Sequence, residues 1–320
     1  MLLGRRSWLG MSLVATGTLV ACGGGGGSPN GAGNGTDGSL SVLLMDAPVD
    51  NVTQVHVQIA ALWLKPADDG AAIELPMATS PITVDLMALT EENAAVLVDN
   101  AIVPVGSYEW LSMDVNAEHD GVMDSYVMTT IGGQEDLEIR VPSGRIRLVS
   151  DFEVEANLAT RFLFDWDLRT GLVNPPGLPG YLLKPAFRVL EVDEYGALAG
   201  TVATNIVTSG DGCRIVDPDQ PDLDPDTGNV VYVFAAADVP ADAIDDIDGT
   251  DPEPVATAVA GFNDEDGYDY RVVLMPGDYT VAFTCEADKD NPETSEDITF
   301  LTPTPTNVNI VAGVEETVDF

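Results

Sequence analysis

Positively charged residues are scarce in this chain. Among its 320 residues, 13 are lysine or arginine and 53 are aspartate or glutamate, which gives a formal net charge of −40. A surface with this balance repels nucleic acid, so we expect no nucleic-acid partner. The same repulsion acts between parts of the chain, and we therefore expect the folded state to depend on salt or on bound cations.

Histidine is scarcer still, with only His56 and His119 in the chain. Nucleophilic catalysis needs a base held beside the nucleophile, and neither histidine lies in a recognisable catalytic motif. No histidine pair has zinc spacing, and no glycine-rich phosphate loop precedes a helix. The sequence therefore predicts a non-enzymatic protein without catalytic residues. Carboxylate chemistry is the enzymatic alternative that this reasoning leaves open.

The apolar run near the N-terminus is too short to span a membrane. Trp8–Val20 has about a dozen residues, and a spanning helix needs about 20. Arg5 and Arg6 precede this run, and Leu19-Val20-Ala21-Cys22 ends it. A basic start, a short apolar run and small residues before a cut are the pattern of an export signal. The cysteine at its end predicts lipid attachment; the alternative is an ordinary secretory signal beside an incidental cysteine.

This pattern matches the lipobox of bacterial lipoproteins, and the match implies an anchored protein. We expect residues 1–21 to be the signal peptide and Cys22 to carry the lipid, so that a membrane is one partner. Residues 22–38 are rich in glycine, serine and asparagine and predict a flexible tether with a reach of roughly 20 Å. In the lipoprotein class, Gly23 rather than aspartate after the cysteine implies the outer membrane, with the leaflet left open.

Three cysteines are present, and Cys22 would be used by the lipid. The remaining pair, Cys213 and Cys285, predicts a disulfide because the protein would lie outside the cytoplasm. Closing a loop of about 70 residues would stabilise the fold by a few kcal/mol. Two free thiols are the alternative.

From Ser39 onward the pattern is that of β-strands. Val55, Val57 and Ile59 alternate with polar residues, and many similar short segments follow with turn residues between them. The predicted fold is all-β, with two antiparallel β-sandwich domains over residues 39–194 and 195–320. The single helix that we expect covers residues 90–98, with Thr90 as its N-cap.

Acidity is concentrated in the second domain, where residues 197–320 carry 3 basic and 27 acidic residues, or 3 − 27 = −24. Calcium takes six to eight oxygen ligands, and alternating aspartates in a loop can supply several. The candidate ligands are Asp217, Asp219, Asp222, Asp224 and Asp226. Gly228 comes one place too late for an EF-hand, and no glutamate occupies the twelfth position. Calcium is therefore the candidate cofactor, and a solvated acidic loop is the alternative.

A second carboxylate pair lies in the first domain. Asp165 and Asp167 flank Trp166 on a predicted strand, so both side chains share one face. That face predicts either a ligand or cation site, or a solvated surface paired with arginines such as Arg169 or Arg188. The second interpretation is the more ordinary one.

Residues 39–193 resemble a family of bacterial lipoprotein domains, domain of unknown function 4382. The motifs that carry the resemblance are Leu40–Pro48, Leu62–Pro66, Val84–Leu86, Pro104–Tyr108, Val141–Gly144, Phe164–Leu168 and Leu182–Pro185. The resemblance implies a surface or periplasmic lipoprotein with a β-sandwich, and it implies no activity. Residues 196–320 resemble transthyretin-like, carboxypeptidase-regulatory-like modules through Gly196–Gly200 and Pro276–Tyr279. The long acidic loops depart from that compact module.

The expected function is a non-enzymatic binding or surface-interaction module of the cell envelope, with envelope proteins or glycans as candidate partners. A structural accessory subunit of an envelope complex is the first alternative, and a carboxylate-dependent hydrolase is the second. Trp63 and Trp110 are candidates for stacking on sugars. Their apolar strand patterns place them in the core instead, which is the more usual position of tryptophan.

Overall fold

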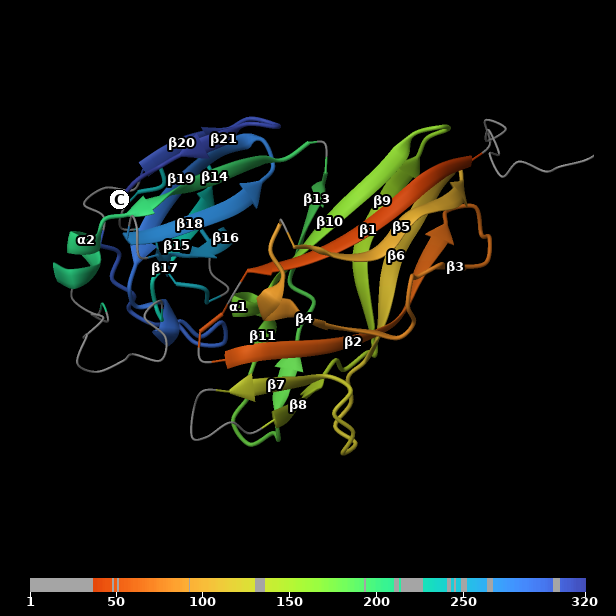
Figure 1. Cartoon of the computed structure of the whole chain (residues 1–320), viewed down its shortest axis with the longest axis horizontal. Coiled ribbons are helices and arrows are strands. Elements are labelled where there is room, and N and C mark those ends of the chain that lie inside the picture. Colours follow the sequence, from red (N-terminus) through yellow and green to blue (C-terminus); the bar gives the residue numbers. More distant parts are fainter. Residues whose placement is uncertain are drawn as a thin grey trace, which may run out of the picture. The chain divides into compact units, whose positions relative to one another are not determined.

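β-strands make up most of the described chain in the computed structural model (Figure 1). The structure describes residues 37–47, 49–50, 52–91, 93–129, 136–192, 194–209, 213, 227–240, 243–244, 246–248, 252–263, 267–301 and 306–320. Over these ranges, no helix has the length and apolar composition needed to cross a membrane.

The first sandwich packs a four-stranded sheet against a nine-stranded one. The smaller sheet has the order β13-β10-β1-β5. Its strands are β1 (Asp37–Ala47), β5 (Ala95–Pro104), β10 (Ala159–Asp167) and β13 (Phe187–Glu191). β1 and β10 are parallel, whereas the other two pairs are antiparallel.

The larger sheet has the order β11-β12-β8-β7-β2-β6-β9, and β3 and β4 also pair with β2. Its strands are β2 (Val52–Pro66), β3 (Ile73–Leu75), β4 (Ile82–Asp85), β6 (Gly106–Asn116), β7 (Tyr126–Thr129), β8 (Asp136–Arg140), β9 (Arg145–Val154), β11 (Leu172–Val173) and β12 (Tyr181–Leu183). Two short helices, η1 (Leu86–Ala88) and α1 (Leu168–Gly171), lie between strands. The 15 residues of β2 are enough to pair with four other strands.

Alternation along β10 explains the core of the first sandwich. Phe162, Phe164 and Trp166 point to one face of the strand and are at most 2% exposed. On neighbouring β13, Phe187 contacts Trp166 with ring centroids 4.4 Å apart. Aromatic side chains bury large apolar areas, so this row supplies much of the stability of the first core.

The second sandwich consists of two four-stranded sheets, β17-β18-β14-β21 and β16-β15-β19-β20. Its elements are β14 (Gly196–Val202), α2 (Thr204–Ser209), β15 (Val230–Ala235), β16 (Pro254–Val259), β17 (Gly261–Asn263), β18 (Gly267–Leu274), β19 (Gly277–Thr284), η2 (Ala287–Lys289), β20 (Thr306–Ile310) and β21 (Glu315–Thr317). The side chains between the sheets form a separate apolar cluster that includes Val231, Val233 and Phe283. Both sandwiches belong to one compact unit, Asn34–Phe320.

The same turn starts a strand in each sandwich. Tyr108 near the start of β6 donates its hydroxyl to the carbonyl of Pro104 at 2.6 Å. Tyr279 near the start of β19 does the same to the carbonyl of Met275 at 2.8 Å. Each tyrosine thereby ties its strand to the backbone four residues upstream, as in a tyrosine corner.

The all-β sandwich fold expected from the sequence is confirmed, with three parallel pairs among the described strands: β1–β10, β8–β12 and β14–β21. The helix expected over residues 90–98 is wrong. Thr90 does accept a hydrogen bond from the backbone amide of Asn93 at 3.2 Å, as an N-cap would. The chain then continues as β5, because valines there favour a strand and β1 supplies ladder partners.

Candidate functional site

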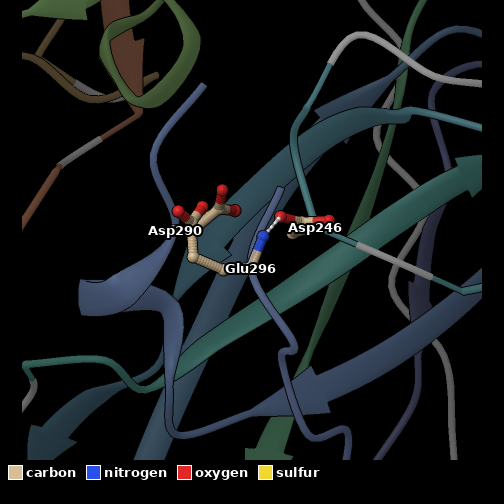
Figure 2. A group of neighbouring side chains, drawn as sticks. All are labelled: Asp246, Asp290 and Glu296. Carbon is tan, nitrogen blue, oxygen red and sulfur yellow. Dashed lines mark hydrogen bonds between the residues drawn. The ribbon is translucent and has the colours of Figure 1, made fainter. Parts of the chain in front are cut away.

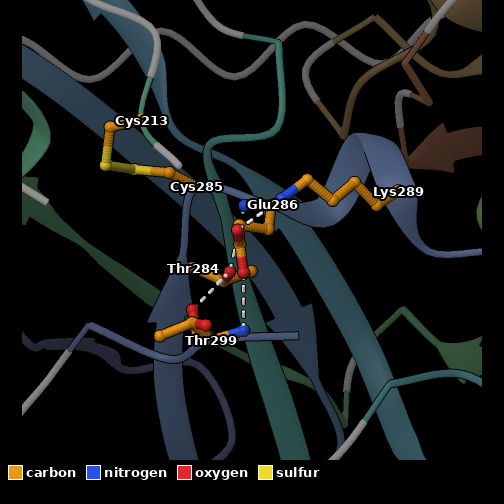
Figure 3. Close-up of a disulfide and its surroundings, with 6 residues drawn as sticks. All are labelled: Cys213, Thr284, Cys285, Glu286, Lys289 and Thr299. Atoms are coloured by element: carbon orange, nitrogen blue, oxygen red, sulfur yellow. Dashed lines mark hydrogen bonds and ion pairs between the residues drawn. A yellow bond between two sulfur atoms is a disulfide. The ribbon is translucent and has the colours of Figure 1, made fainter. Parts of the chain in front are cut away.

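Most site residues predicted from the sequence lie outside the described part of the chain. These are the lipid-attachment cysteine, Cys22, and the five candidate calcium ligands, Asp217, Asp219, Asp222, Asp224 and Asp226. Their predicted roles therefore stay predictions. The remaining predicted pair, Cys213 and Cys285, forms a disulfide in the structure (Figure 3).

Cys285 directly follows β19, and the residues on either side of it form hydrogen bonds with the backbone of Thr299. Cys285 is 1% exposed. Beside it, Thr284 donates its hydroxyl to the carbonyl of Thr299 at 2.8 Å, and Glu286 accepts the amide of Thr299 at 2.8 Å (Figure 3). The ion pair with Lys289 lowers the pKa of Glu286. These contacts show a structural role for the region around the disulfide.

The two carboxylates of the Asp165–Asp167 pair have separate partners. Asp165 is 1% exposed and forms an ion pair with Arg188 on β13. Asp167 instead caps α1, where its carboxylate accepts the amide of Thr170 at 3.1 Å. Burial raises the pKa of Asp165, and Arg188 opposes this rise. The arginine pairing of the more ordinary interpretation is confirmed at Asp165, whereas the expected solvated surface is wrong there because the carboxylate is buried.

A cavity of about 430 Å³ lies beside Asp165, where the first sandwich meets the second. Arg188 crosses this boundary and donates to the carbonyl of Val273 on β18 at 2.9 Å. Arg271 on the same strand pairs with Glu91 and Glu315. Both arginines in the wall of this cavity therefore already have carboxylate partners.

A second cavity of about 430 Å³ contains a buried arginine, Arg169. This residue of α1 is 3% exposed and donates to the carboxylate of Asp50 at 2.9 Å and the carbonyl of Ala287 at 2.7 Å. Asp50 also accepts the amide of Gly228 at 2.9 Å. Arg169 and Asp50 thus each bond a backbone group of the second sandwich. Removing either one would leave the other as an uncompensated buried charge.

A cluster of three carboxylates is the arrangement that sequence reasoning missed (Figure 2). Asp246, Asp290 and Glu296 each place one oxygen within 4.8 Å of the others. Carboxylate oxygens are the ligand type of a hard cation such as calcium, and three of them are fewer than the six to eight oxygens that calcium takes. Burial raises the pKa of Asp290 to about 6, although a hydrogen bond from the Tyr232 hydroxyl at 2.5 Å acts in the opposite direction.

Hydrogen bonds within the loops account for the shape of this carboxylate cluster. Asp290 accepts the amide of Ile247 at 3.2 Å, and Glu296 accepts the amide of Asn291 at 3.2 Å. The amide of Glu296 donates to Asp246 (Figure 2). Asp246 and Asp290 therefore each accept a backbone amide from the other loop, whereas the Glu296 carboxylate accepts one from its own loop. This structural role needs no ion. No local sequence spacing connects Asp246 to the other two, so only the fold could reveal the cluster.

Trp63 and Trp110 lie on the outer face of the nine-stranded sheet and are half-buried, so the expectation that they are core residues is wrong. The indole nitrogen of Trp63 donates to Asp114 at 2.8 Å. Arg145 lies 5.8 Å from the centroid of the Trp63 ring, and Arg147 lies 5.7 Å from that of Trp110. The arginines thus cover part of the aromatic surface that a sugar would stack on.

Residues 37–185 match the model of one protein family, described as Domain of unknown function (DUF4382). This match confirms the family resemblance of the first sandwich, and the description names no activity. No curated protein matches the chain.

Several solved structures show a distant likeness. The Bacillus anthracis TIE protein is 11% identical, and the alignment covers 89% of this chain and 34% of that one, with a TM-score of 0.18. GBS52, the minor pilin of Streptococcus agalactiae, is 12% identical, with 88% and 94% covered and a TM-score of 0.20. The fimbrial anchor protein Mfa2 from Porphyromonas gingivalis is 8% identical, with 76% and 78% covered and a TM-score of 0.16. This chain spans about a third of the TIE protein, and TM-scores this low carry no argument about function.

Proposed function

We propose that this chain is a lipid-anchored, non-enzymatic interaction module of the bacterial cell envelope, held in the outer membrane. The observation that carries the proposal is the segment Leu19-Val20-Ala21-Cys22 at the end of a short apolar run. A run of this length cannot span a bilayer, and small residues before the cut are typical of export signals. The cysteine at its end supplies the thiol for lipid attachment.

Two further observations support export. The Cys213–Cys285 disulfide fits an oxidising compartment, because reducing conditions in the cytoplasm make such bonds rare. The family match over residues 37–185 fits as well, since the resemblance to this family implies a surface or periplasmic lipoprotein. Apart from export, the Gly196–Gly200 motif supports our assignment of the second sandwich as a transthyretin-like module.

The chemistry of the described clusters favours binding over catalysis. Asp290, with a pKa raised to about 6, is the best general-acid candidate among the described residues and supports a hydrolase as the second candidate function. Its carboxylate oxygens, however, already accept hydrogen bonds from Tyr232 and Ile247. Because these hydrogen bonds give the Asp290 carboxylate a structural role, we rank the interaction module above the hydrolase.

Lipid attachment is tested in cells that process lipoproteins. The full chain with a C-terminal tag is expressed with radiolabelled palmitate, and the label on the purified protein is measured together with its membrane fraction after density-gradient separation. We expect the wild type to carry the label and to sediment with the outer membrane. Cys22→Ala should lose the label.

The matched control is the double variant Cys213→Ala/Cys285→Ala, which removes the other two cysteines and should keep the label. An unlabelled wild type, or a labelled Cys22→Ala variant, would refute the anchor. A labelled protein in the inner-membrane fraction would retain the anchor and overturn the outer-membrane assignment.

A further inference from the structure

We propose that the end of the first sandwich nearest the tether docks on the phospholipid surface that holds the Cys22 lipid. The proposal rests on the lipid anchor proposed above. Its contact surface is formed by Ile102, Val105 and Leu158, which we call the N-terminal rim. These apolar side chains are 73%, 37% and 55% exposed, respectively.

The rim surrounds the point where the described chain begins. Ser39 of β1 pairs with Ile102 of β5, and its amide donates to the carbonyl of Leu158 at 3.1 Å. Ile102 and Leu158 therefore flank the first residues of β1 on its two sides. Val105 lies in the turn between β5 and β6. Figure 1 shows the start of β1, the end of β5 and the connection between β9 and β10 at the same end of the first sandwich.

Close backbone packing fixes the rim in place. A Cβ atom added to Gly38 would lie 2.5 Å from both the side chain of Val154 and the carbonyl oxygen of Glu155. Only glycine allows β1 to approach the end of β9 so closely. The amide of Asn157 also donates to the carbonyl of Asp37 at 3.2 Å. The three apolar side chains thus project from a well-packed end of the sandwich.

The covalent chain identifies the occupant as the membrane. Cys22 and Asp37 are 37 − 22 = 15 residues apart, and a fully extended chain of that length spans at most about 50 Å. The lipid therefore confines the start of β1 to the neighbourhood of the bilayer. Exposed apolar residues are favourable there because the bilayer interface removes them from water.

The charges beside the rim determine which lipids it fits. Asp37 lies between the rim residues, and Glu155 is exposed beside Leu158. Anionic lipids would repel these carboxylates at close range, whereas zwitterionic lipids would not. The rim therefore fits a zwitterionic surface, with shallow burial of apolar side chains as the favourable contribution.

The test uses full-length lipidated protein in phosphatidylcholine vesicles. Leu158→Cys provides a free thiol, since the other cysteines are used by the lipid and the disulfide, and it is labelled with an environment-sensitive fluorophore. Spin-labelled lipids should quench this fluorophore. The matched control is Val122→Cys, because Val122 is 52% exposed and comes after the far end of β6. The 11 residues of β6 span about 33 Å from Gly106 to that end. The fluorophore of this control should stay unquenched.

The contribution of the rim is measured by quenching of the 158 label in two further variants. Ile102→Ser should lower the ratio of docked to undocked protein by about tenfold, as expected for loss of one large apolar contact. Val311→Ser, an equally conservative change at a 47% exposed position in the second sandwich, should leave it unchanged. Replacing phosphatidylcholine by phosphatidylglycerol should weaken quenching.

Mass spectrometry of the N-terminal peptide separates failure of the docking proposal from failure of the anchor. If the peptide carries the lipid and the 158 label is not quenched, the docking proposal is wrong and the anchor stands. Equal quenching at positions 122 and 158 would also overturn it, because the sandwich would then have no preferred orientation. A peptide without lipid would refute the anchor and, with it, the docking.

Discussion

At the scale of single residues, Asp114 shows how a carboxylate on a neighbouring strand can hold an aromatic side chain at the surface of a sheet. Asp114 accepts two hydrogen bonds from Arg145, at 2.5 and 2.9 Å, and a third from the indole of Trp63. These contacts explain why Trp63 can lie on the outer face of a sheet. The apolar residues around Trp63 in the sequence predicted a core position. This prediction failed because the sequence pattern does not show that Asp114 on the neighbouring strand accepts a hydrogen bond from the indole.

Replacing Asp114 by asparagine tests this contact through pH. The hydrogen bonds from Arg145 lower the pKa of Asp114 below its ordinary value of 3.8, against the effect of burial. A lowered folded-state pKa stabilises the fold above the unfolded pKa, and this stability is lost as the pH falls through the folded pKa. Because the pair is partly exposed and screened, we expect Asp114→Asn to cost at most about 1 kcal/mol at pH 7.

Urea unfolding of the wild type and of Asp114→Asn at pH 7 and at pH 3 measures this cost. The difference in the free energy of unfolding should shrink at the lower pH. Asp99→Asn is the control, because it makes the same charge change on β5, where the carboxylate accepts a hydrogen bond from the neutral amide of Asn100 at 2.6 Å. A difference for Asp114→Asn that does not change with pH would refute the role of the ion pair.

At the scale of elements, glycines mark where strands approach each other most closely. The sequence motif Gly196–Gly200 opens β14, and its two glycines face the C-terminal segment. A Cβ atom at Gly196 would lie 2.4 Å from the carbonyl oxygen of Val311. One at Gly200 would lie 1.8 Å from that of Val318. The motif therefore has a physical cause, which is the close approach of the C-terminal segment on either side of β21 to the backbone of β14.

Gly200→Ala should separate this pair of strands. The added methyl group cannot coexist with the Val318 carbonyl, which also accepts a hydrogen bond from the Tyr270 hydroxyl at 2.6 Å. We expect a loss of about 2 kcal/mol or more in the free energy of unfolding, measured with urea, since backbone rather than a flexible side chain must move. The amides of Val318 and Phe320, which donate to Ala199 and Thr201, should exchange with solvent faster.

Gly277→Ala is the matched control for that experiment. It makes the same change at the start of β19, where the nearest atom to an added Cβ is a Tyr279 ring carbon at 3.4 Å. This is an ordinary contact, so the control should cost little. Equal destabilisation by both substitutions would mean that the general strand preference of glycine and alanine, rather than the close approach, sets the effect.

At the scale of the whole molecule, local patterns predicted strands better than they predicted partners. Period-two alternation of Phe162, Phe164 and Trp166 placed β10 and its core face, because burial on one side of a strand leaves a local trace. The parallel pairing of β10 with β1 left none, since it joins residues more than a hundred positions apart. The approach of the Asp246 and Asp290 carboxylates could not be predicted either, because their two loops are brought together only by the fold.

The net charge of −40 causes repulsion across the entire chain. Self-repulsion should fall as ions screen it, so we expect the melting temperature of the full-length protein to rise with sodium chloride. If screening is the whole effect, calcium and magnesium at equal ionic strength will raise it equally. A specifically bound ion at 100 times its dissociation constant would instead add about 2.7 kcal/mol to the free energy of unfolding.

Variants then locate any calcium-specific rise in the melting temperature. Its loss in Asp222→Ala/Asp224→Ala would establish the site predicted from the aspartate spacing. Its loss in Asp290→Asn would place the ion at the cluster with Asp246 and Glu296, and would show that the hydrogen bonds between these loops also shape a cation site. Equal responses to calcium and magnesium in all variants would mean that neither group of carboxylates is a calcium site. A calcium site should distinguish the two ions, because its cavity size and number of ligands suit only one of them.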